Sequence, residues 1–160
     1  MLTEFEPVTE GLFNLLNEWE PKLHSLSQDV ISNRRNSQHR SIKQITGHMV
    51  DSASNNTHRI VHLQYQESPF TFPNYATQGN NDRWIAIQHY QDENWNDLVE
   101  LWNYSNLHII HLIKQIKPEF LNQQWMASPD TNVTLKEMVI DYLPHFKLHL
   151  SEIEELINLE

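Results

Sequence analysis

The sequence of 160 residues has no cysteine, only three glycines and no apolar run long enough to span a membrane. Without cysteine there can be no disulfide and no thiolate ligand, so a metal site must use nitrogen and oxygen donors. A membrane-spanning helix needs about 20 apolar residues. Residues 1–6 also lack the basic start and apolar run of a signal peptide. We therefore expect a cytoplasmic protein with no membrane partner.

Basic residues are also few, because 11 lysines and arginines stand against 21 acidic residues and give a formal net charge of −10. The average field of such a chain repels phosphate backbones, so we expect no nucleic-acid partner. Histidine, in contrast, is abundant, with ten copies. Neutral imidazole is the commonest metal ligand and a common acid–base group. The histidines are therefore the first candidates for a functional site.

Apolar residues recur at intervals of three and four along most of the chain, which is typical of amphipathic helices. The length fits one domain, so we predict a single all-α domain over residues 1–160, built as a four-helix bundle. Helices are expected at about residues 8–26, 41–65, 92–116 and 134–158. Residues 66–90 are rich in turn residues and predict a long crossover between the second and third helices, with a short helix at about 83–87. A shorter loop through residues 128–130 should precede the last helix.

Local signals mark several of these boundaries. Ser41 with Gln44, and Thr134 with Glu137, match the capping box that starts a helix. Pro21 should bend or divide the first helix near Glu20, and Pro144 should kink the fourth, because proline lacks a backbone donor and clashes with the preceding turn.

Three histidines form the strongest candidate site. His145 and His149 are four residues apart, so they share one face of the fourth helix, at the border of its apolar side. His48 lies on the shoulder of the apolar stripe of the second helix and can face the same cavity. Three imidazoles from two helices, with one position left for water or substrate, are the layout of a catalytic metal site.

Spacing alone does not single out this set. The pairs His58/His62 and His108/His111 could also chelate an ion, and composition alone favours partly buried histidines satisfied by carbonyl or carboxylate groups. The choice between these sets rests on similarity to a known family.

Two segments resemble the DinB-like superfamily of metal-binding four-helix bundles, and more specifically its metal-dependent hydrolase branch, which is related to bacillithiol- and mycothiol-dependent transferases. Residues 45–52, around His48, resemble the first histidine segment of that family. Residues 141–150 resemble its closing His-x-x-x-His helix, and residues 102–116 its third helix. The resemblance covers roughly residues 12–157. It implies that His48, His145 and His149 bind one divalent ion, commonly zinc or nickel, and it is compatible with a homodimer.

Other polar residues are candidates for supporting roles. Asp51 and Asp141 are the nearest acidic residues that could accept a ring N–H of a ligating histidine, and Asp51 is also a candidate catalytic group. Tyr142 could donate to a developing oxyanion or simply pack its ring. Asn55 and Arg59 could hold an anionic substrate, or could be polar surface of a bundle helix. Trp84, Trp95 and Trp102 could wall the pocket but fit core positions better.

Three functions remain open from the sequence. The first is a metal-dependent enzyme acting on a small molecule, which is a hydrolase if the ion activates water and an S-transferase if it activates a low-molecular-weight thiol. The second is a non-catalytic metal-binding or stress-associated bundle, in which the ion ties two helices together. The third is an interaction bundle whose histidines are incidental.

Overall fold

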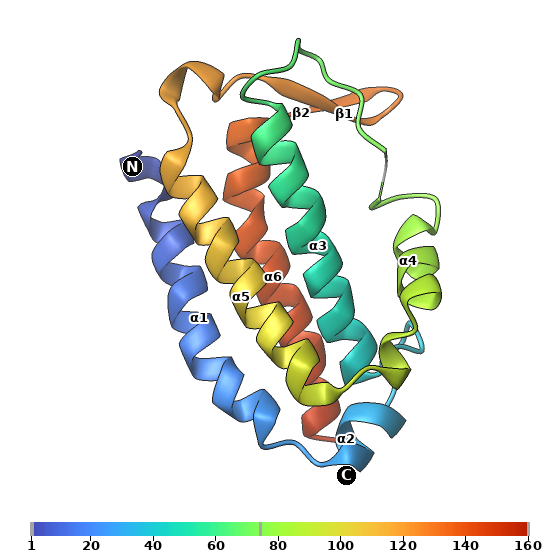
Figure 1. Ribbon diagram of the computed structural model, residues 1–160. Coiled ribbons are helices and arrows are strands. Elements are labelled where there is room, and N and C mark those ends of the chain that lie inside the picture. The colour runs from blue at the N-terminus through green and yellow to red at the C-terminus, as the bar shows by residue number, and fades with distance from the viewer. Residues whose placement is uncertain (1, 74, 160) are drawn as a thin grey trace.

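The computed structural model describes residues 2–73 and 75–159 and shows a bundle of four long helices (Figure 1). They are α1 (Glu6–His24), α3 (Ile42–His62), α5 (Trp95–Gln115) and α6 (Leu135–Ile157). Both predicted capping boxes are complete, at the starts of α3 and α6. The predicted four-helix bundle is therefore confirmed. Neither α1 nor α6 ends at its internal proline, so Pro21 does not divide the first helix.

The order of the helices in space explains the long crossover. Helix α5 packs against α1 and α3, and α6 packs against the same two helices. In Figure 1, α1 and α6 run one way and α3 and α5 run the other way. Because α3 and α5 are parallel, the chain must return along the bundle between them. This return contains α4 (Asn80–Gln88), longer than the predicted short helix, and the 3-10 turn η2 (Tyr90–Asp92).

The structure corrects the sequence prediction in the loops. Residues predicted as a loop before the last helix form an antiparallel hairpin of β1 (Gln124–Ser128) and β2 (Thr131–Thr134), with Trp125 opposite Val133. Strands of five and four residues are too short to carry a clear alternating pattern, so periodicity missed them. Three short elements were also not predicted, namely α2 (Gln28–Asn33), η1 (Thr3–Phe5) and η3 (Pro118–Phe120).

Aromatic and aliphatic side chains from all four long helices fill the centre of the bundle. Trp102 of α5 is fully buried, and its ring stacks on Phe146 of α6 with centroids 5.7 Å apart. Trp95 is also buried and donates its indole N–H to the Leu23 carbonyl. Both tryptophans are therefore core residues. Among the described residues, no helix is long and apolar enough to cross a membrane.

One face of α3 is unusual because its buried residues are polar. They are His48, Asp51, Ser52, Asn55, Asn56 and Arg59. The crossover covers part of this face, since both α4 and η2 pack on α3. Helix α3 is thus buried on a polar side as well as an apolar side, and the polar side carries the candidate site.

Two contacts hold the crossover against α3. Tyr90 lies directly over Gly47, where an added Cβ would come within 2.2 Å of the Tyr90 ring. The Tyr90 hydroxyl then donates to Asp51 Oδ1 at 2.6 Å, and Gln88 Nε2 donates to the same oxygen at 2.7 Å. Burial raises the pKa of Asp51 from 3.8 to about 6, and these two hydrogen bonds offset only part of that rise.

Gly47→Ala should destabilise the fold by roughly 1–3 kcal/mol, because the new methyl group overlaps the buried Tyr90 ring and outweighs the better helix propensity of alanine. The test measures the free energy of unfolding in urea for Gly47→Ala, for Tyr90→Leu and for the double variant. The alanine should cost less on the Tyr90→Leu background, because the obstructing ring is gone. Equal cost on both backgrounds would contradict this packing.

The raised pKa of Asp51 predicts a pH-dependent stability difference between the natural protein and Asp51→Asn. The folded state holds the Asp51 proton more tightly than the unfolded state, so this stabilisation is complete below pH 3.8 and is lost as pH rises through about 6. The unfolding free energy of the natural protein, relative to the variant, should fall by on the order of 3 kcal/mol over that range. Urea unfolding of both proteins at four pH values measures it, and a difference independent of pH would contradict the burial argument.

Candidate metal centre

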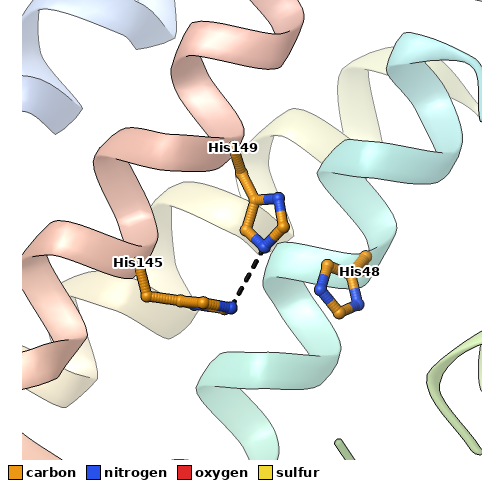
Figure 2. A group of neighbouring side chains, drawn as sticks. All are labelled: His48, His145 and His149. Atoms are coloured by element: carbon orange, nitrogen blue, oxygen red, sulfur yellow. Dashed lines mark hydrogen bonds between the residues drawn. The ribbon is translucent and has the colours of Figure 1, made fainter. Parts of the chain in front are cut away.

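Three histidine side chains converge between α3 and α6 (Figure 2). His145 and His149 come from successive turns of α6, and His48 comes from the facing turn of α3. The Nε2 atoms of His145 and His149 are 3.2 Å apart. The His48 ring lies edge-on to the His149 ring, with centroids 4.6 Å apart. One nitrogen from each residue lies within 4.8 Å of the other two, so the geometry brings together the three residues singled out by the sequence.

Hydrogen bonds orient two of the three rings. His149 Nδ1 lies 2.9 Å from Glu152 Oε2, and His48 Nδ1 lies 2.5 Å from the Tyr75 hydroxyl oxygen. When Nδ1 carries the proton and donates it to such an oxygen, Nε2 keeps its lone pair for an ion. Burial raises the pKa of Tyr75 far above its usual range, so the phenol stays protonated. Its hydroxyl can donate to the His48 carbonyl oxygen at 3.3 Å and accept from His48 Nδ1.

Burial also keeps His48 and His145 neutral. It lowers the pKa of His48 from 6.5 to about 2, helped by the positive charges that His149, Arg40 and His145 can carry. It lowers the pKa of His145 to about 4, against the opposing pull of Asp141 and Glu152. A neutral imidazole is the form that binds metal, so protons do not compete for these two ligands near pH 7.

The donor set fits a divalent transition metal. Imidazole suits zinc, nickel and copper, whereas calcium and magnesium prefer oxygen. Two nitrogens bound at about 2.0–2.1 Å to one tetrahedral ion lie roughly 3.3 Å apart, close to the separation of His145 Nε2 and His149 Nε2. Within the described chain one other donor group has three members, Glu20, His24 and Glu100, but all three are partly exposed. The pairs His58/His62 and His108/His111 belong to neither group.

A cavity of about 630 Å³ opens beside the triad and is lined by His48 and His145. Its walls come from α3 and α6, and the hairpin contributes Trp125 and Val133. Pockets of 300–1,000 Å³ are of the size that small molecules and cofactors occupy. The histidines therefore border a space large enough for a small-molecule ligand.

The other sequence candidates separate into two groups. Tyr142 and Arg59 line the cavity, and Asp141 lies exposed at its edge. Asn55 does not line it, and its amide donates to the Asp51 backbone carbonyl. Asp51 bonds to the crossover through Tyr90 and Gln88 rather than to a site histidine.

Tyr142 is buried in the bundle and hydrogen-bonded to α5. Its hydroxyl donates to Asn106 Oδ1 on α5 at 2.8 Å, and the residue is 6% exposed. Burial raises its pKa far above the ordinary value, so the phenol stays protonated at neutral pH. In this arrangement the proton of Tyr142 points to Asn106 rather than into the cavity.

Sequence analysis missed three residues of the site. Glu152 stands three residues after His149, a spacing that places both on one helix face and could have been noticed. Tyr75 comes from the crossover and Trp125 from the hairpin, so only the tertiary fold brings them to α3. Trp84, Trp95 and Trp102 do not line the cavity. Trp84 contacts Tyr75, with ring centroids 5.2 Å apart.

Comparison with known proteins identifies the fold. No protein-family model and no curated protein matches the sequence. The structure is similar to that of YfiT from Bacillus subtilis, described as a probable metal-dependent hydrolase with an unusual four-helix bundle topology. The TM-score is 0.82 over 98% of this chain and 87% of that chain, at 15% sequence identity. The two proteins therefore share the four-helix bundle fold, and this chain contains a histidine group that could hold a metal ion.

Proposed function

We propose that this protein is a metal-dependent enzyme of the DinB-like superfamily that acts on a small molecule, with one divalent ion held by His48, His145 and His149. The observation that carries the proposal is the convergence of three imidazoles, two of which line the wall of a 630 Å³ cavity. Zinc and nickel are the ions that best suit three nitrogen ligands and that the family resemblance implies. The similarity in fold to a probable metal-dependent hydrolase supports the same conclusion.

Each residue of the site has a distinct task in this proposal. A divalent ion bound there would supply Lewis acidity, which brings the pKa of a coordinated water or thiol toward neutrality. His48, His145 and His149 hold the ion, while Glu152 and Tyr75 fix the orientation of two of the rings. With water as nucleophile the reaction is a hydrolysis, and with a low-molecular-weight thiol it is an S-transfer.

The cavity supports a catalytic ion over a purely structural one. In structural sites a fourth protein ligand closes the coordination sphere, whereas catalytic sites leave one position to water or substrate. Among the described histidine, aspartate and glutamate residues, the donor group at this site ends at three members. His48 and His145 also line the cavity, so the fourth position can be reached from it.

Removing the three ligands should abolish metal binding. Elemental analysis of the untagged natural protein should find about one zinc or nickel per chain, and the His48→Ala/His145→Ala/His149→Ala variant should contain none. The variant His108→Ala/His111→Ala is the control. It removes two exposed histidines whose rings stack on each other on α5, and it should keep the metal. Equal metal content in the natural protein and the triple variant would refute the proposed site.

Glu152→Gln should weaken metal binding about 10- to 100-fold without removing a ligand, because the neutral amide orients and polarises the His149 ring less strongly than the carboxylate does. Competition with a chromogenic chelator measures the affinity. Glu155→Gln is a matched control, since it removes an acidic charge from the same helix three residues further on. The assignment of Glu152 fails if both variants bind the metal as tightly as the natural protein does.

A further inference from the structure

The cavity contains a buried cation that has no counterion among the described residues. Arg59 is 6% exposed, and its Nε and Nη2 atoms are enclosed by protein without a hydrogen-bond acceptor among the described residues. None of the ion pairs found in this part of the chain includes Arg59. Burial lowers its pKa only to about 10, so the guanidinium keeps its charge at neutral pH. An uncompensated buried charge is costly to a fold, and a ligand that neutralises it recovers that cost.

Aromatic rings hold Arg59 in place. Its guanidinium carbon lies 4.1 Å from the ring centroid of Trp125 on β1 and 5.8 Å from that of Phe72 in the crossover. These contacts stabilise the cation through the faces of the rings, while its Nε and Nη2 atoms have no acceptor within residues 2–73 and 75–159. The hairpin and the crossover thus fix the position of the charge without neutralising it.

Arg59 and the histidine triad lie at two points along the same cavity. His48, Ser52, Asn56 and Arg59 all line it, and their spacings of four, four and three residues place them along one face of α3. His48 and Arg59 are eleven positions apart, which places their backbones about 16 Å apart along the helix axis. A ligand that reaches both side chains must therefore extend along α3.

The acidic residues that line the cavity do not compensate Arg59. Glu137 and Asp141 are both exposed on α6. The Glu137 carboxylate already accepts hydrogen bonds from the Thr134 hydroxyl and backbone amide in the capping box. Asp141 lies near enough to His145 to raise the pKa of that histidine. Asp141 therefore lies toward the histidine end of the cavity.

We infer that Arg59 is the anion-binding end of this cavity, so that the substrate is an elongated small molecule with a terminal carboxylate or phosphate at Arg59 and its reacting group at the histidines. The orientation of the substrate rests on the proposed metal-dependent function, whereas the anion site depends only on the cavity. A guanidinium binds both anions through charge-assisted hydrogen bonds, so either chemistry fits.

Metal-free protein provides a test of the anion site that does not depend on the metal. We would titrate chelator-treated, ¹⁵N-labelled protein with hexanoate, hexyl phosphate and hexanamide, and follow the indole N–H signal of Trp125, assigned with a Trp125→Phe variant. At least one anion should bind about 10-fold or more tightly than the neutral amide, in keeping with a hydrogen bond to a charged group. Comparison of hexanoate with hexyl phosphate shows which anion the site prefers.

Variants show whether the preference comes from Arg59. Arg59→Met keeps much of the apolar stem and should remove the preference for anions, whereas Arg59→Lys keeps the charge and should retain part of it. Arg83→Met, which removes an exposed cation from α4, is the control and should bind like the natural protein. Equal binding of hexanoate, hexyl phosphate and hexanamide by the natural protein overturns the inference even if Arg59→Met does not fold. An unchanged preference in a folded Arg59→Met variant, or no response to either anion, also overturns it.

Discussion

Three imidazole rings pack edge-on to one another between α3 and α6, and the rest of the site is built around this packing. Two of their Nε2 atoms stand 3.2 Å apart, and burial keeps His48 and His145 neutral. The hydrogen bond between His145 and His149 uses one nitrogen of each ring, and His48 bonds through Nδ1 to Tyr75. A divalent ion could use one lone pair from each of the three rings, which would give their convergence a physical reason.

The crossover and the hairpin supply the residues that surround the three histidines. Parallel α3 and α5 require a crossover, and the crossover brings Tyr75 to His48 and Tyr90 to Asp51 (Figure 1). Gly47 permits the close approach of Tyr90, one residue before His48. The hairpin between α5 and α6 then adds Trp125, which completes the wall of the cavity beside Arg59. The two segments outside the bundle thus determine what can reach the histidines.

Sequence periodicity was sufficient for the four long helices, since two capping boxes and a regular apolar spacing specify local structure. The convergence of the three histidines was also accessible, because His145 and His149 share a helix face, His48 lies on the shoulder of the second helix, and the family resemblance favoured this set over the other histidine pairs. Glu152 was within reach of the same helical spacing. Tyr75 and Trp125 could not be found this way, because their contacts depend on how the crossover and the hairpin fold back on α3. The proposed role of Arg59 needed the structure too, since only its burial and contacts show that its charge has no partner in the described part of the chain.

We propose that His48, His145 and His149 together bind one divalent ion and leave a coordination position open to the cavity. X-ray absorption spectroscopy at the zinc or nickel edge of the metal-loaded protein tests this proposal. The spectrum should show three imidazole nitrogens, recognised by the outer-shell scattering of their rings, and at least one further oxygen ligand that a small thiol can replace with sulfur. A spectrum without three imidazole ligands, or a first shell completed by protein ligands and unchanged by thiol, would contradict it.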